Sequence, residues 1–343
     1  MLTEEMLRQD PDWIPLLTGL PTEWFWQLVQ DTHTRCPDYE RQRHTRPDRQ
    51  RAIGGGRSFD LPLVMRIALV LTYLRQHLTQ TLTAKLFGAT QSDVSRDLRR
   101  LLPLLKQALP GPEVWQIVET KHELLAEERL ALADLADGQV LVDASEQQVY
   151  RAQDSVTRRE HYSGKKKMFT LKTQFVTDGD HHIEAISAAV PGATHDKTLS
   201  DEIKTVERLP DGCHVRADKG YQGLDKQVSL VTVRNPETGE TRQVPRLTLE
   251  TPFKKPKGGA LTAEQECFNQ VLSSIRVRVE HCIGWVKNWR IISTRFRCAH
   301  EIYDSVMQIV CGLVNWQTQR WQNAEAPAQV AVCTGQSVIV HRL

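Results

Sequence analysis

The hydrophobic pattern of the chain changes near residue 137, and this change limits the folds open to it. Before this point apolar residues recur at helical spacing, and residues 61–78 are apolar nearly all round, which is typical of a buried helix. After it, residues 140–143 form a short apolar run, and residues 169–177 and 183–190 form two strand-like segments around a turn. The sequence therefore predicts an all-α region followed by an α/β domain with a mixed sheet.

The remaining elements follow from the same periodicities. We expect short helices over residues 1–40, a helical stretch over 113–135, and further strands over 213–218 and 247–251. The other expected helices cover residues 81–87, 91–102, 197–208, 262–289 and 302–322.

Composition excludes several classes of protein. The chain has 343 residues, of which 40% are hydrophobic and 25% are charged, the balance of a folded globular protein. Its longest apolar run, residues 61–74, is interrupted by Arg66 and is too short to span a bilayer. The 7 cysteines are scattered and form no C-x-x-C pair, which favours free thiols in a reducing compartment. We therefore expect a cytoplasmic protein without a membrane partner.

Charge is informative through its distribution, because 44 Lys and Arg against 42 Asp and Glu leave a net charge of only +2. Residues 41–57 hold six arginines against a single acid, Asp48, and end in three glycines. This segment is either a solvated linker or an arm that follows DNA phosphates.

Residues 81–102 have the pattern of a helix-turn-helix unit. A short helix is followed by Gly88-Ala89-Thr90, where Thr90 suits the N-cap of the next helix. In such a unit the start of the second helix enters the major groove, although a small helical bundle would give a similar pattern. The polar residues expected to contact DNA there are Gln91, Ser92, Ser95, Arg96, Arg99 and Arg100.

Three carboxylates are candidates for one site. Asp143 ends the first expected strand, Asp218 ends the fourth, and Glu280 lies within a long helix. Strand ends in an α/β sheet face a common crevice, and oxygen-only ligands favour Mg²⁺ or Mn²⁺. Two such ions about 3.5–4 Å apart can activate an attacking oxygen and stabilise a leaving one on a phosphodiester. Each acid alone could equally be a turn former or a solvated side chain. The basic residues around Glu280 are Arg276, Arg278, Lys287, Arg290, Arg295 and Arg297.

Five blocks of sequence, in this order, resemble the DDE transposases of bacterial insertion sequences, and most closely the Harbinger-related group. They are Val142-Asp143-Ala144-Ser145, His161-Tyr162-Ser163-Gly164-Lys165-Lys166-Lys167, Pro191-Gly192-Ala193-Thr194-His195-Asp196-Lys197-Thr198-Leu199, Ala217-Asp218-Lys219-Gly220-Tyr221-Gln222-Gly223, and Ser274-Ile275-Arg276-Val277-Arg278-Val279-Glu280-His281 with Gly284 and Lys287.

The resemblance implies an RNase H-like catalytic domain in which Asp143, Asp218 and Glu280 bind the metal. Asp143 would bridge two ions, and Asp218 and Glu280 would hold one each. Arg276 and Lys287 match the spacing of the Y-R-E-K signature and would bind phosphate, while its tyrosine position falls on Ser273. Further phosphate contacts are expected from Lys165, Lys166, Lys167 and Lys219. For the pair His195-Asp196 we prefer a helix cap to metal binding.

The resemblance also implies a function and a domain plan. The chain would bind terminal inverted repeats, cut the transposon ends and join them to target DNA, as a homodimer or larger complex at the bacterial nucleoid. Alternatives are a domesticated DNA-binding regulator and a metal-dependent nuclease without strand transfer. The expected units are a helical segment with a basic linker (1–57), a helix-turn-helix domain (58–136), the catalytic domain (137–322) and a tail (323–343).

Base readout by the second helix can be tested with Arg96→Ala. If Arg96 reads bases, this change weakens binding to the specific site by about 1–3 kcal/mol and weakens nonspecific binding less. The measurement is a titration of both DNAs at one salt concentration. An equal loss on both would make Arg96 a phosphate contact only.

Overall fold

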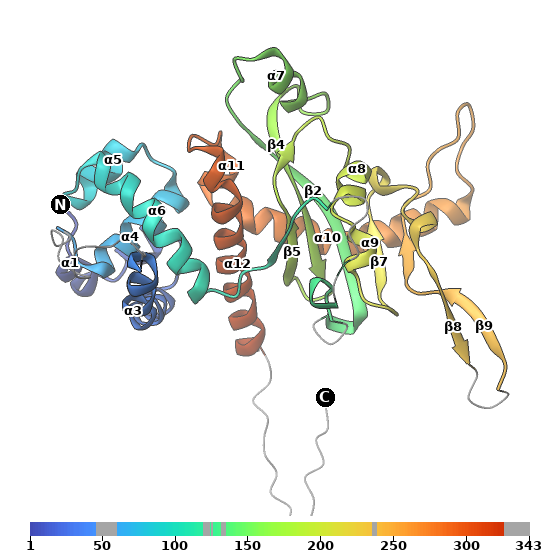
Figure 1. The fold of residues 1–343 in the computed structure, drawn as a ribbon, viewed down its shortest axis with the longest axis horizontal. Helices are drawn as coiled ribbons and strands as arrows, with labels where there is room; N and C mark the ends of the chain where they lie inside the picture. The colour runs from blue at the N-terminus through green and yellow to red at the C-terminus, as the bar shows by residue number, and fades with distance from the viewer. Residues whose placement is uncertain (46–59, 119–123, 125, 132–134, 235–238, 326–343) are drawn as a thin grey trace, which may run out of the picture.

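The structure is a computed structural model that describes residues 1–45, 60–118, 124, 126–131, 135–234 and 239–325. Most of the basic segment 41–57, part of the stretch 113–135 and nearly all of the tail 323–343 lie outside these ranges. In Figure 1 the helical N-terminal part lies at one end of the molecule and the sheet with its covering helices at the other.

The N-terminal part consists of helices. They are α1 (Glu4–Gln9), α2 (Trp13–Thr18), α3 (Thr22–His44), α4 (Leu63–Gln76), α5 (Gln80–Phe87) and α6 (Gln91–Ala108). Helix α4 is buried almost all round, as its mostly apolar sequence predicted. Gly88 ends α5 with a φ of 69°, and the Thr90 side chain caps α6 in a capping box with Asp93. The helices and the turn of the expected helix-turn-helix unit are therefore present.

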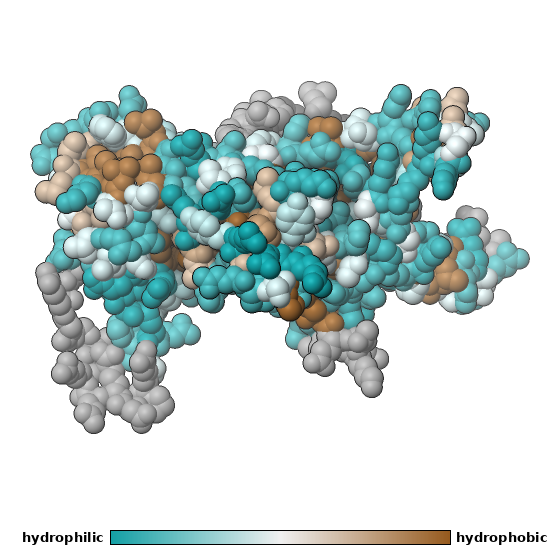
Figure 2. Space-filling model, turned by 90° about the horizontal axis from the view of Figure 1, so that it is seen from above, coloured by the Kyte–Doolittle hydropathy of each residue, from teal (hydrophilic) through white to brown (hydrophobic). Residues whose placement is uncertain are grey.

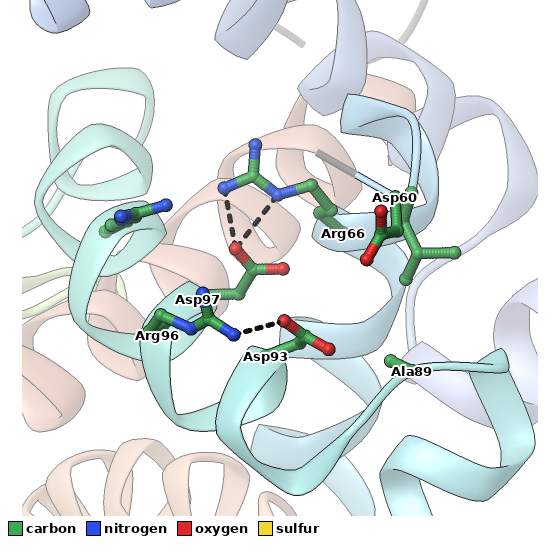
Figure 3. Close-up of a pocket in the computed structure, with 8 residues that line it drawn as sticks. Asp60, Arg66, Ala89, Asp93, Arg96 and Asp97 are labelled. Atoms are coloured by element: carbon green, nitrogen blue, oxygen red, sulfur yellow. Dashed lines mark hydrogen bonds and ion pairs between the residues drawn. The ribbon is translucent and has the colours of Figure 1, made fainter. Parts of the chain in front are cut away.

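A buried ion pair fixes α6 against α4. The Arg66 guanidinium donates through Nε and Nη2 to Oδ1 of Asp97, at 2.9 and 2.6 Å (Figure 3). Both side chains are less than a tenth exposed, so removing either would leave a buried charge without its counter-ion. This interaction explains why an arginine stands within an otherwise apolar helix.

The second part is built on an eight-stranded mixed sheet with the strand order β1-β5-β4-β2-β7-β10. Strands β5, β4 and β2 pair antiparallel, whereas β7 runs parallel to both β2 and β10, and β1 runs parallel to β5. The strands are β1 (Glu113–Trp115), β2 (Gln139–Gln148), β3 (Tyr162–Ser163), β4 (Met168–Asp178), β5 (Ile183–Ser187), β6 (Val190–Pro191), β7 (His214–Ala217) and β10 (Thr248–Glu250). The RNase H-like mixed sheet expected from the sequence is confirmed.

Helices cover both faces of this sheet. Val140 and Val142 of β2 pack into one core with α8 (Asp196–Glu202) and α9 (Thr205–Arg208). Leu141 points to the other face and joins a core shared by α10 (Ala263–Lys287), α11 (Arg290–Ser293), α12 (Tyr303–Glu325) and the N-terminal helices. The alternation along β2 therefore assigns each of its side chains to one of two cores.

Two sequence expectations fail. The helix expected over 113–135 is wrong, because β1 lies there as a strand at the edge of the sheet. A two-stranded hairpin, β8 (Leu230–Arg234) and β9 (Thr241–Pro245), was not expected and projects from the sheet in Figure 1. Both faces of the hairpin are largely exposed, and β9 lacks the apolar alternation that would have marked it as the partner of β8.

The surface agrees with these assignments. In Figure 2 hydrophilic side chains cover most of the face in view, and a hydrophobic patch lies over the helical N-terminal part. No helix in the described ranges is long and apolar enough to cross a membrane.

The helical part is joined to the rest through the end of α4. The Nδ1 atom of His77 lies 2.6 Å from Oγ1 of Thr294, and Arg297 donates to the carbonyl oxygens of His77 and Leu78. Nearby, Arg75 donates to the carbonyl oxygen of Asn288 at 2.8 Å. Burial and the charge of Arg297 lower the pKa of His77 from 6.5 to about 4, so the ring is neutral at pH 7.

This junction predicts a pH dependence of stability. Because the pKa of His77 is lower in the folded chain than in the unfolded chain, its contribution is complete above pH 6.5 and is lost as the pH falls towards 4. The loss reaches about 3 kcal/mol in the free energy of unfolding. Urea unfolding of wild type and His77→Gln between pH 7.5 and 4.5 measures it, and the variant should show the shallower dependence. Parallel curves would mean that His77 does not titrate in this way.

Candidate active site

Strand pairing brings the first two predicted acids together. Strands β2 and β7 run parallel, with Val142 opposite Ala217 as their last pair. The next residue of each chain segment is the candidate carboxylate, Asp143 on β2 and Asp218 directly after β7. Asp218 begins the 3-10 turn Lys219–Tyr221, as its N-cap residue. The two side chains are therefore neighbours where β7 ends. The expectation that Asp143 ends its strand is wrong, because β2 continues to Gln148 by pairing with β4.

A guanidinium lies against both carboxylates. Arg276 of α10 donates through Nη1 to Oδ1 of Asp218 and through Nη2 to Oδ2 of Asp143, each at 3.3 Å. The Arg276 side chain is 8% exposed, so it reaches the acids from within the molecule. The other oxygen of Asp143 accepts the backbone N–H of Ala144 at 2.7 Å. Arg276 is the predicted phosphate ligand, and here its charge is balanced by the two acids.

The surroundings of Asp143 disfavour the charged form of its carboxylate. Burial raises the pKa of Asp143 above its ordinary value, and the negative charges of Asp218 and Asp196 raise it further. The Ala144 N–H and the Arg276 charge act in the opposite direction. Carboxylates crowded in this way favour any additional cation that can bind to them.

Glu280 lies on the same helix as Arg276 but is exposed. Because α-helical residues are 100° apart, Arg276, Glu280 and Lys287 lie within roughly 40° of one another around α10. Arg276 contacts Asp143, and the charge of Asp143 also acts on the pKa of Lys287. The helix face that carries Glu280 is thus the face turned towards the acid pair. Among the described residues, no three Asp, Glu, His or Cys side chains form a group ready to hold a metal ion.

The structure accordingly brings Asp143, Asp218 and Arg276 into contact and leaves the Glu280 carboxylate outside that contact. Asp143 and Asp218 supply oxygen donors of the kind that Mg²⁺ and Mn²⁺ prefer, so these residues fit a divalent cation. The part of Glu280 in the metal site remains a prediction.

Apart from Lys287 on α10, the predicted phosphate-binding lysines lie in two exposed turns, one before β4 and one after β7. Lys165, Lys166 and Lys167 form an exposed turn between β3 and β4. Burial lowers the pKa of Lys287, and the charge of Lys166 lowers it further, so that turn lies within electrostatic range of α10. Lys219 follows Asp218 and is exposed.

The predicted DNA-reading residues lie along the start of α6. Gln91, Ser92, Arg96 and Arg99 are exposed, and Ser95 and Arg100 are partly exposed, whereas Val94 and Leu98 are buried. Arg96 donates to the Asp93 carboxylate at 2.6 Å, as Figure 3 shows. The surface needed for groove contact is therefore available on α6, with Arg96 engaged in a local ion pair.

Three residues beside the acids were not assigned to the site from the sequence. Lys172 of β4 donates to Asp196 at 2.7 Å, and the buried Tyr221 hydroxyl has no hydrogen-bond partner among the described residues. Asp196, Asp143 and Asp218 all raise the pKa of Tyr221, whose burial is the larger cause. The one feature of the sequence that could have indicated these three residues is a lysine within the buried strand β4. His195 occupies the N-cap position of α8, as preferred, but its side chain makes no capping hydrogen bond.

Comparison with known proteins agrees with this geometry. The family described as DDE superfamily endonuclease matches residues 142–315, and the helix-turn-helix of DDE superfamily endonuclease matches residues 60–111. The chain is similar to a probable transposase for insertion sequence element IS702 of Microchaete diplosiphon, with 28% identity over 76% of this chain and 83% of the relative. A putative transposase for insertion sequence element IS112 of Streptomyces albus G is 24% identical over 82% of this chain and 86% of the relative. No solved structure matches significantly.

The balance between Arg276 and the acids predicts a pH-dependent loss of stability in Arg276→Met. Without the guanidinium the pKa of Asp143 rises further in the folded chain, so the protonated form is favoured. The variant should then be close to wild type below about pH 4 and lose about 2 kcal/mol as the pH rises through the folded pKa. Urea unfolding in EDTA at several pH values measures this. Arg278→Met, on the same helix, is the control, and equal effects of the two variants would contradict the prediction.

Proposed function

Because this chain belongs to the DDE superfamily of endonucleases and is a transposase, we propose that it cuts the ends of an insertion sequence and joins the freed 3′-OH to target DNA. The observation that supports this most is the pairing of β2 with β7, which sets Asp143 beside Asp218 in contact with Arg276. An acid pair with a neighbouring cation suits a phosphodiester, since it offers a place for a metal and one for a phosphate.

Membership of the DDE superfamily implies a divalent cation. The finer proposal is Mg²⁺ or Mn²⁺ as two ions, because two metal ions suit phosphodiester exchange. Asp143 would contact both, and Asp218 and Glu280 one each. When bound, the ions would supply activation of the attacking oxygen and charge stabilisation of the leaving one.

We propose that Glu280 joins Asp143 and Asp218 through a change of side-chain rotamer. Its side chain is exposed, so it has rotational freedom, and it projects from the α10 face that also carries Arg276 and Lys287. A cation between the carboxylates would offset their mutual repulsion and favour this approach.

Arg276 and Lys287 are proposed to hold the scissile phosphate. A guanidinium matches the geometry of phosphate oxygens through two parallel N–H groups, and Lys287 adds a point charge from the next turns of the same helix. Lys165, Lys166, Lys167 and Lys219 would bind phosphates further from the cut, where exposed lysines gain affinity by releasing counter-ions.

The helix-turn-helix region implies that DNA is bound. We propose that α6 reads bases of the terminal inverted repeats through Gln91, Ser92, Ser95, Arg96, Arg99 and Arg100. Cutting two transposon ends and joining them in one complex engages an active site at each end, so the working complex is proposed to be a homodimer or larger. We propose that this work takes place at the bacterial nucleoid, where the DNA substrate lies.

Two other functions are separated from this one by their products. A DNA-binding regulator would bind ends without cutting them, and a nuclease would cut without joining. Intact Asp143 and Asp218 in one contact favour catalysis over the regulator.

Cleavage and strand transfer of labelled transposon ends with Mg²⁺ test the proposal. Asp143→Asn and Glu280→Gln should bind ends with unchanged affinity and lose more than about 100-fold in cleavage, beyond what outer residues of a metal site contribute. Asp225→Asn, an exposed acid after β7, is the matched control. Cleavage by Asp143→Asn at the wild-type rate would remove Asp143 from the site, and normal cleavage by Glu280→Gln would remove Glu280 alone.

A further inference from the structure

A buried ion pair lies beside the acids on the other face of the sheet. Nζ of Lys172 is 2.7 Å from Oδ1 of Asp196 and 2.5 Å from the carbonyl oxygen of Thr194. Lys172 lies on β4, and its side chain is 8% exposed. Asp196 is the first residue of α8. The lysine therefore ties the start of α8 to the central sheet.

The Asp196 side chain rests on the turn that carries Asp218. A Cβ atom added to Gly220 would lie 2.6 Å from Oδ2 of Asp196 and 3.3 Å from its Cβ. Gly220 is two residues beyond Asp218, in the 3-10 turn Lys219–Tyr221 that follows β7, near α8 in Figure 1. A side chain at this position would have to displace either Asp196 or the turn, so the absence of a side chain permits the contact.

The other end of the ion pair is fixed to the strand of Asp143. Lys172 stands directly opposite Glu146 of β2, with Nζ and Oε1 at 4.0 Å. Glu146 is itself held by the Thr170 hydroxyl, which donates to Oε2 at 2.7 Å. Glu146 lies three residues from Asp143, so its side chain points to the opposite face of the sheet.

These contacts connect the two acids by a second route. On the α10 face, Arg276 contacts Asp143 and Asp218 directly. On the α8 face, the connection runs from β2 through Lys172 and Asp196 to the turn after Asp218.

We propose that Lys172 and Asp196 are positioning residues that set the separation of the Asp143 and Asp218 carboxylates, and thereby the affinity of the site for a divalent cation. This inference rests on the proposed function. Asp196 acts through Gly220 and the turn, on which its side chain rests.

Titration calorimetry of the DNA-free protein with Mn²⁺ tests the pair. Asp196→Asn and Lys172→Met should each weaken Mn²⁺ binding roughly 10- to 100-fold, the range found for residues that orient metal ligands. Lys172→Arg, which keeps the charge, should restore binding to within about threefold. The double variant should bind Mn²⁺ about as weakly as either single variant, because both break one connection.

The same helix supplies a matched control. Lys197 and Asp201 form an exposed ion pair at 2.6 Å, one residue further along α8. Lys197→Met should leave the Mn²⁺ affinity unchanged within about twofold, as exposed pairs contribute little. Hydrogen exchange of metal-free Asp196→Asn gives a second readout, and its amides 218–221 should exchange faster than in wild type while the thermal transition remains cooperative.

The outcomes separate the proposed metal site from the positioning role of Lys172 and Asp196. Wild-type protein that binds no Mn²⁺, or binds it equally after Asp143→Asn, would overturn the metal site and the positioning pair with it. Mn²⁺ binding that depends on Asp143 but not on Asp196 or Lys172 would overturn the pair alone. Additive losses in the double variant, or no rescue by Lys172→Arg, would also contradict it.

Discussion

The register between β2 and β7 is the constraint on which the site depends. Parallel pairing that ends at Val142 and Ala217 leaves an aspartate as the next residue on each side. The two neighbouring carboxylates repel each other, and the pKa of Asp143 is raised by burial and further by this proximity. A shift of the register by one residue would turn one of them to the other face of the sheet. The apolar residues 140–142, which are buried on the two faces of the sheet, thus also fix the face on which the carboxylate of Asp143 lies.

Two buried cations from separate elements balance the acids of this region. Arg276 approaches from α10, and Lys172 from β4 balances Asp196 and lies near Glu146. Each is less than a tenth exposed, so neither is screened by water as a surface residue would be. Acidic and basic side chains therefore alternate in this region of the sheet. The loss of one partner would leave the charge of its neighbour without a counter-ion.

Sequence reasoning reached the residues whose positions follow from a single element. Asp218 was placed by a strand end, and Arg276, Glu280 and Lys287 by their spacing on one helix. Asp143 was placed by the end of an apolar run, although its strand continues to Gln148 through pairing with β4 that the run does not reveal. It missed Lys172 and Asp196 because their contact joins β4 to α8 across 24 positions, and neither local pattern contains the partner. Strand β1 was taken as helix because an edge strand of three residues has too few positions to show a period. The β8–β9 hairpin escaped because both of its faces meet water.

The segment after α10 is shared by the two halves of the molecule. Gln147 of β2 donates to the carbonyl oxygens of Ile291 and Thr294, and the hydroxyl of Thr294 meets His77 at the end of α4. The strand of Asp143 and the helical N-terminal part are thus attached to one short stretch of backbone. In the function proposed above, such an attachment would set the number of base pairs between the recognised sequence and the cut by the protein's own dimensions, so an insertion within the DNA end would displace the cut.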